Sequence, residues 1–216
     1  MLPMAVEGRM PLAYSAAITV VCGAAYGGAL GAWTSPRLAV YAAIKVPLLL
    51  LLTATITALL NWITASLAGL PLRFHESVAL TVMPLAIASL ILASCAPVAL
   101  FFAKSIPPPG EGQRTLHNVL YLTHTLLVAG AGVSGTAFLQ NALTRHCGGD
   151  AGRASRIRRV WIAAYALVGG EIAWALRPFV GSVYLEVEFL RHDALHGNVY
   201  EFIFTDILPN LFRSLR

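Results

Sequence analysis

Glu171 is the residue of greatest chemical interest, because it is a carboxylate inside a long apolar segment. It follows Val160, where that segment begins, by eleven positions, so on a helix it lies roughly 16 Å from the start, near the middle of a membrane. A charged carboxylate there costs at least about 2.5 kcal/mol, which makes such residues candidate ion or proton sites. The alternative is a protonated or hydrogen-bonded Glu171 that only holds helices together.

Arg177 is the nearest cation along the chain, six residues after Glu171. On a straight helix this spacing turns the two side chains about 120° apart and separates them by roughly 9 Å, so each needs a partner from another element. Pro178 removes a backbone donor and frees a carbonyl near Trp174, which allows the chain to bend and Arg177 to face inward.

A second apolar segment carries Lys45 near one end and a line of polar residues deeper in. We expect Lys45 to extend its ammonium group to the membrane surface. Thr53, Thr57, Asn61 and Thr64 recur at spacings of four, four and three residues and therefore share one helix face. This face either lines an aqueous path or holds helices together through hydrogen bonds to backbone and neighbours.

His117, Tyr121 and His124 share a face at the start of another apolar segment. Imidazoles titrate near neutral pH, so this face is a candidate for gating or relaying protons. The two histidines lie about 10 Å apart along a helix and cannot share a metal ion without other ligands. His146 with Cys147 supplies only half a site, so we expect no metal.

Motifs of soluble enzymes do not appear in the sequence. We find no nucleophile motif, phosphate-binding loop, haem-ligand pair or zincin motif, and we therefore expect no enzymatic activity and no cofactor. Cys22 and Cys95 fall in apolar segments and Cys147 in a basic loop, which does not indicate a disulfide framework.

The composition is that of a membrane protein, with 57% hydrophobic and 12% charged residues in a chain of 216 and a mean hydropathy of +0.71. The formal charge of +5 is spread between apolar segments, which argues against nucleic-acid binding. We predict an all-α fold, a polytopic transmembrane helix bundle with five spans. The predicted spans are Leu12 to Trp33, Leu38 to Leu67, Ser77 to Phe102, Asn118 to Leu143 and Val160 to Phe179.

The orientation follows from the loop between the fourth and fifth segments. It holds five arginines and one aspartate, which predicts a cytoplasmic location. Counting back places the N-terminus with Arg9 in the cytoplasm, and the Pro107 to Pro109 loop and the C-terminal tail outside. The arginines of the loop are Arg145, Arg153, Arg156, Arg158 and Arg159.

We expect two parts, a bundle over residues 1–182 and an extracytoplasmic tail over 183–216. Apolar and polar residues alternate over Val183 to Phe189, which predicts a short extended segment. This segment brings Glu186 and Glu188 toward Arg177. We expect a tail carboxylate, or Glu171 from another helix, to neutralise that arginine. Asn198 and Glu201 form a helix-capping pair. The amphipathic helix that follows is expected to lie in the membrane interface.

Gly23, Gly27 and Gly31 repeat every fourth residue in the first segment and predict close approach of another helix. That helix belongs either to the same chain or to another subunit, and we expect a homo-oligomer. Pro84 and Pro97 each remove one backbone bond in the third segment and predict kinks.

A long apolar span has Asn61 at its inner end and is followed by Gly69, Phe74, Glu76 and Pro84. On these residues, the stretch from Lys45 to Phe102 resembles the core of the Yip-domain family, small five-span membrane proteins with a cytoplasmic N-terminus and an outward C-terminus. The resemblance implies that topology here; the eukaryotic members are linked to vesicle trafficking and Rab binding. Residues 175–182 and 197–201 resemble bacterial polytopic proteins.

We therefore expect an oligomeric channel or transport component of a bacterial inner membrane. Its expected partners are the lipid bilayer and further copies or a larger membrane complex. The alternative is a non-conducting scaffold or accessory subunit. A permeation residue must touch water, whereas a scaffold residue can stay dry. The candidate pore or transport residues are Glu171, Arg177, Asn61, Thr57, His117, Tyr121 and His124.

Overall fold

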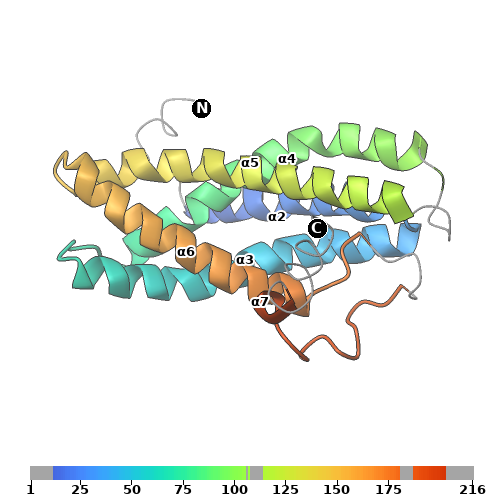
Figure 1. The fold of residues 1–216 in the computed structure, drawn as a ribbon. Coiled ribbons are helices and arrows are strands. Elements are labelled where there is room, and N and C mark those ends of the chain that lie inside the picture. Colours follow the sequence, from blue (N-terminus) through green and yellow to red (C-terminus); the bar gives the residue numbers. More distant parts are fainter. Residues whose placement is uncertain (1–11, 106, 108–113, 181–186, 203–216) are drawn as a thin grey trace, which may run out of the picture.

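The computed structural model describes residues 12–105, 107, 114–180 and 187–202. These residues form an all-α fold without strands (Figure 1). Five helices are long, and a sixth has four residues. The helices are α2 (Leu12–Gly31), α3 (Pro36–Leu67), α4 (Phe74–Ser105), α5 (Arg114–His146), α6 (Ala151–Ala175) and α7 (Val199–Phe202).

Four helices are long and apolar enough to cross a membrane, namely α2, α3, α4 and the Leu122–His146 part of α5. Helices α3 and α4 have 32 residues each, or about 48 Å, which exceeds a hydrocarbon core of about 30 Å. Large apolar side chains such as Val21, Val98 and Val133 are exposed on the outer faces of these helices. The chain therefore has the build of a multi-pass membrane protein.

The fifth predicted segment, Val160 to Phe179, differs from the helix that forms. Helix α6 begins earlier because Asp150 caps it, accepting a hydrogen bond of 2.8 Å from the Arg153 backbone. It ends at Ala175, just before Arg177 and Pro178, since a proline disfavours a helical conformation in the residue that precedes it. Helix α6 is not among the helices apolar enough to span a membrane.

Helix α6 and the residues that follow it nevertheless run beside α3 over its whole length. Figure 1 shows α6 lying beside α3 and ending before the far end of the bundle. The non-helical residues up to Val180 complete the path. The contacts that trace it are Arg153 with Ala68, Gly169 with Thr53, Pro178 with Lys45, and Val180 with Thr34.

The glycine face of α2 packs on α3 of the same chain. A Cβ atom added at Gly27 would overlap the Ala42 carbonyl group, and one at Gly31 would lie 2.6 Å from the Leu38 carbonyl oxygen. The two backbones therefore meet where only glycine fits. Gly135 of α5 likewise lies against the Pro84 carbonyl of α4.

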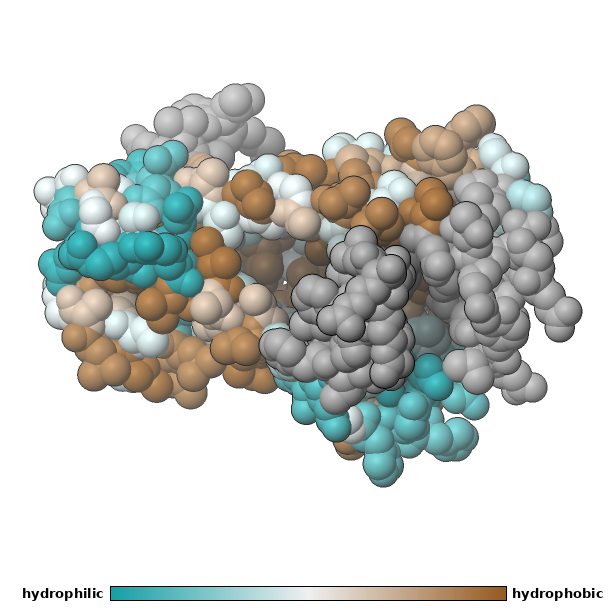
Figure 2. Space-filling view, viewed as in Figure 1, coloured by the Kyte–Doolittle hydropathy of each residue, from teal (hydrophilic) through white to brown (hydrophobic). Residues whose placement is uncertain are grey.

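Hydrophilic residues gather near one end of the bundle, around the start of α6, and over residues 187–198 (Figure 2). The first group includes the arginines predicted to face the cytoplasm. Between the two groups the surface is largely apolar, as expected for helices with lipid-facing middles.

The tail is described over residues 187–202. The Asn198 side chain accepts a hydrogen bond of 2.7 Å from the Glu201 backbone, which confirms the predicted cap. Helix α7 follows directly. Residues 183–186 of the predicted extended segment and residues 203–216 of the predicted amphipathic helix lie outside the described residues.

Candidate functional site

A pocket of about 370 Å³ lies where α6 approaches its end beside α3. Leu52, one of its lining residues, is the seventeenth of the 32 residues of α3, so it marks the middle of that helix. Helix α3 is a candidate membrane span, and the pocket lies level with the middle of that helix. The lining residues are Leu52, Glu171, Ile172, Trp174, Ala175, Leu176, Ala194, Leu195 and Gly197.

Glu171 is the acidic residue of this pocket, and its side chain is half-buried. Within the described part of the chain, the structure gives its carboxylate no hydrogen bond and no salt bridge. The Tyr200 hydroxyl, from α7, instead donates to the Ala166 and Leu167 carbonyls at 2.8 and 3.0 Å. An acidic group among apolar walls, without a protein cation beside it, is suited to bind a small cation or a proton.

Arg177 closes the end of α6. Its guanidinium lies over the Trp174 ring, 3.8 Å from Cζ to the ring centroid, and donates to the Trp174 carbonyl at 2.8 Å. It also donates to the backbone carbonyl and the carboxylate of Asp193, each at 3.1 Å. A cation here satisfies the carbonyls and the partial negative charge at the helix C-terminus.

The partner of Arg177 is thus a tail carboxylate, as predicted, but the residue is Asp193. Glu188 lies 3.8 Å from His192 instead, and Glu186 is outside the described residues. Desolvation alone would raise the pKa of Asp193, but the charge of Arg191 and the hydrogen bond from Arg177 lower that pKa below its usual value.

Lys45 is fully buried, so the expectation that it extends to the membrane surface is wrong. Its ammonium group donates to the Pro178 carbonyl at 3.1 Å. It also lies over the rings of Phe189 and Phe179, at 5.2 and 6.0 Å from their centroids. The reason is the helix break, because the non-helical segment covers Lys45 and offers it an acceptor.

The polar face of α3 lies inside the bundle. Thr57 donates to the Thr53 carbonyl at 2.6 Å, and the Asn61 amide donates to the Thr81 hydroxyl of α4 at 3.1 Å. Tyr165 of α6 donates to the Thr81 carbonyl at 2.8 Å. Of these two transport candidates, Asn61 therefore binds a neighbouring helix, whereas the buried Thr57 hydroxyl binds the backbone of its own helix.

Two oxygens on this face have no hydrogen-bond partner within the described residues, the Asn61 side-chain carbonyl and the Thr53 hydroxyl. Thr53 also contacts Gly169, two residues before Glu171. Because Thr53, Thr57 and Asn61 are spaced by about 6 Å along the helix axis, they form a polar line that leads from the level of the pocket toward the Leu67 end of α3.

His124 lies elsewhere, between α5, α4 and α2. Its Nδ1 atom and the Tyr26 hydroxyl are 2.8 Å apart, and the two rings pack edge to face with centroids 5.7 Å apart. The side chains of His117 and Tyr121 are outside what the structure describes. The structure therefore does not bring His124 and Glu171 into one site.

Sequence reasoning did not identify Asp193, Tyr26, Tyr165 or Thr81 as site residues. Tyr26 had a local signal, since it directly precedes Gly27 of the glycine repeat. Thr81 had one too, because it lies one turn before Pro84, where a helix bends and carbonyls are freed. Tyr165 had none, because its partner Thr81 is distant in sequence. The sequence predicts a tail carboxylate as the partner of Arg177 but does not single out Asp193.

Among the described residues, no group of three His, Cys, Asp or Glu side chains lies close enough to hold a metal ion. All three cysteines are free thiols. No protein-family model, curated protein or solved structure matches this chain. The resemblance to Yip-domain proteins therefore stays a prediction, and the function is argued from geometry.

Proposed function

We propose that the chain is a transport component of a bacterial inner membrane, in which Glu171 binds a small cation or a proton at mid-depth. The observation that carries this proposal is the Glu171 carboxylate, which has no hydrogen bond or salt bridge among the described residues and lines a pocket level with the middle of α3. Buried carboxylates in membrane proteins normally have a cationic or hydrogen-bonded partner. In this proposal the transported ion takes that place.

The helix break supports the proposal. Helix α6 ends one turn after Glu171, and the chain continues without helical structure through Pro178. In transporters with discontinuous helices, the half-helix C-terminus and unwound carbonyls help to hold the coupling cation near the membrane centre. Arg177 and Lys45 bind carbonyls near the break, which stabilises it without occupying Glu171.

The polar line on α3 gives the proposed path a direction. The unpaired oxygens of Thr53 and Asn61 are acceptors for water or for a cation that moves away from Glu171. They lead toward the end of α3 beside Arg153, which the positive-inside rule assigns to the cytoplasm.

The proposed topology has five crossings, of which α6 and residues 176–180 form the last. The N-terminus is then cytoplasmic, and the tail over residues 183–216 is extracytoplasmic. We also propose that the chain self-associates and that it is related to Yip-domain proteins.

The proposal can be tested in proteoliposomes that contain a pH-sensitive dye, with sodium- and potassium-sensitive dyes in parallel samples. We expect wild-type vesicles to dissipate a proton, sodium or potassium gradient faster than empty vesicles. Glu171→Gln should remove this activity, whereas Glu188→Gln, a neutralised tail acid, should retain it. Equal rates for wild type and Glu171→Gln would refute the role of Glu171.

The second candidate function is a non-conducting scaffold, and the internal use of Asn61 and Lys45 favours it. The variant Glu171→Cys, made in a background that lacks the three native cysteines, separates the two functions. A membrane-impermeant thiol reagent should reach the introduced thiol in a transport component. Protection of that thiol, together with wild-type vesicles that do not conduct any of the three ions, would favour the scaffold.

A further inference from the structure

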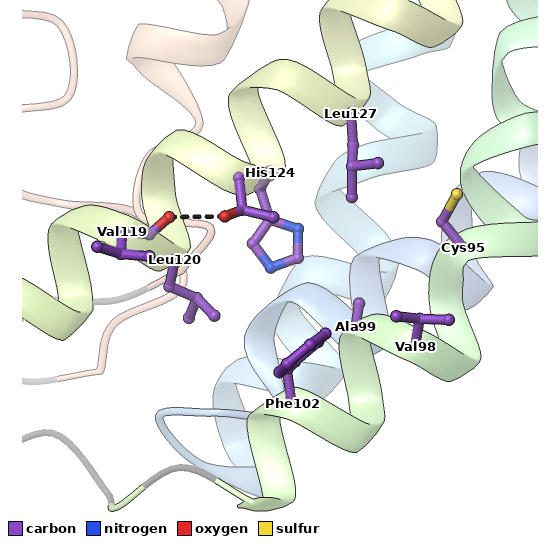
Figure 3. Close-up of a pocket in the computed structure, with 9 residues that line it drawn as sticks. Cys95, Val98, Ala99, Phe102, Val119, Leu120, His124 and Leu127 are labelled. Carbon is purple, nitrogen blue, oxygen red and sulfur yellow. Dashed lines mark hydrogen bonds between the residues drawn. The ribbon is translucent and has the colours of Figure 1, made fainter.

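A second cavity, of about 590 Å³, lies between α4 and α5 (Figure 3). It shares no lining residue with the Glu171 pocket. Its volume is within the range of about 300–1,000 Å³ that is typical of small-molecule sites. The lining residues are Cys95, Val98, Ala99, Phe102, Val119, Leu120, Thr123, His124 and Leu127.

The cavity borders the lipid-facing surface. Val98, Phe102 and Val119 line it, and each is at least half exposed on the outside of the bundle. Val98 and Phe102 belong to α4, a candidate membrane span, and Val119 lies on α5 just before the Leu122–His146 part that is apolar enough to span. Because lipid surrounds this surface, a ligand reaches the cavity from within the membrane, and its body must be apolar.

His124 gives the cavity a buried polar group. The side chain is 7% exposed, and its ring projects from α5 into the space between the two helices (Figure 3). The Nδ1 atom is engaged with the Tyr26 hydroxyl. Within the described part of the chain, the structure gives the ring no second hydrogen bond, and Nε2 is the ring nitrogen that Tyr26 does not engage.

The tautomer of His124 follows from Tyr26. The Tyr26 side chain is 1% exposed, and His124 is its hydrogen-bond partner among the described residues. A buried phenol needs an acceptor for its hydrogen, so we assign Nδ1 as that acceptor. The Nε2 atom then carries the proton and donates. Thr123 is not a competing donor, because its hydroxyl binds the Val119 carbonyl at 2.8 Å.

The ligand must also be uncharged. Apart from His124, the lining contains no ionisable group except the Cys95 thiol, so a phosphate or a carboxylate would lack a counter-charge. The group that meets Nε2 is therefore a neutral acceptor such as a carbonyl oxygen. A flat ring that carries carbonyls also suits walls made by Phe102 and Leu127.

We propose that this cavity binds the headgroup of an isoprenoid quinone, with His124 Nε2 donating to one quinone carbonyl and the isoprenoid tail extending into the membrane. This site is independent of the Glu171 pocket, and its test uses no transport assay.

The full-length protein in nanodiscs is irradiated with an azido-ubiquinone, and the cross-links are mapped by mass spectrometry. We expect cross-links within residues 95–102 and 119–127. Excess decylubiquinone should remove them, and dioctanoylglycerol, a neutral carbonyl lipid of another class, should not. His124→Phe should weaken the competition by decylubiquinone about 5- to 10-fold, as expected for one lost hydrogen bond.

Matched variants separate binding from folding. Thr123→Trp fills the cavity and should abolish the cross-links, whereas Leu122→Trp, at an exposed neighbouring position, should retain them. His124→Gln keeps an amide donor and should bind better than His124→Phe. Cross-links outside the cavity, equal competition by dioctanoylglycerol, or unchanged labelling of Thr123→Trp would overturn the proposal.

Discussion

Gly27→Ala is the perturbation for which the structure gives the clearest expectation. The added Cβ atom would overlap the Ala42 carbonyl group of α3, and it would also lie 3.1 Å from a methyl group of Val46. A backbone carbonyl in a helix cannot turn aside as a flexible side chain does. Helices α2 and α3 must therefore move apart, and the neighbouring contacts at Gly31 are weakened too.

The magnitude can be estimated from the next residue along the same helix. At Gly28 an added Cβ would meet the Ala43 Cβ at 3.8 Å, an ordinary contact. Gly28→Ala should therefore stabilise the protein by about 0.5–1 kcal/mol through helix propensity alone. Gly27→Ala gains the same stabilisation from helix propensity, but it is destabilised by about 1–3 kcal/mol through overpacking. The two variants should thus differ by about 1–3 kcal/mol.

Thermal unfolding of the purified protein in mild detergent measures this difference. For a chain of this size, 1 kcal/mol corresponds to about 2–4 °C in Tm, so Gly27→Ala should melt about 2–12 °C below Gly28→Ala. Gly27→Leu should be worse than Gly27→Ala. If the two alanine variants melted together, or if Gly27→Ala melted higher, the close contact between α2 and α3 would be refuted.

Four further predictions concern the end of α6 and the topology. Arg177→Ala should make residues 187–198 more sensitive to protease, and Arg177→Lys should rescue this only in part, because a point charge replaces a planar fork. The pKa of Asp193 is lowered in the folded protein, so at pH values above its unfolded pKa of about 3.8 the ionised carboxylate should protect the tail from protease. This protection should be lost as the pH falls through the lower folded pKa, and Asp193→Asn should remove the pH dependence. Lys45→Ala should cost about 2 kcal/mol or more in a melting experiment, since it leaves the Pro178 carbonyl without its donor and opens a cavity. In a cysteine-free background, an impermeant maleimide added outside should label a cysteine at position 188 and not one at position 153, and the reverse pattern would invert the topology.

The helices of the bundle could be predicted from the sequence because their signals are local. Ser35 and Pro36 predict a boundary, and α3 begins there, with the Ser35 side chain accepting from the Leu38 backbone at 3.0 Å. Gly69 likewise follows α3 in a left-handed conformation, with φ of 70°. Apolar runs of 20 residues or more have few structures available other than a membrane helix.

The end of α6 could be predicted only in part. Pro178 predicts a bend near Trp174, but a proline in a membrane helix either kinks the helix or ends it. Whether the chain leaves the helix there depends on what receives the freed carbonyls, and the receiving groups lie far away in sequence. Lys45 is 133 residues from Pro178, and no local pattern reports that contact.

The helix break and the buried cations explain each other. A freed carbonyl such as that of Pro178 is costly inside a membrane unless a donor binds it, and a buried ammonium such as that of Lys45 is costly unless it finds an acceptor. The Lys45 ammonium donates to the Pro178 carbonyl, so each group has a partner. Arg177 likewise donates to the Trp174 carbonyl, and its charge is balanced by Asp193. Glu171, one turn before the break, receives none of these cations as a partner. Among the described residues, Glu171 is the carboxylate of this pocket to which the structure gives no hydrogen bond and no salt bridge, and the proposed cation site rests on that difference.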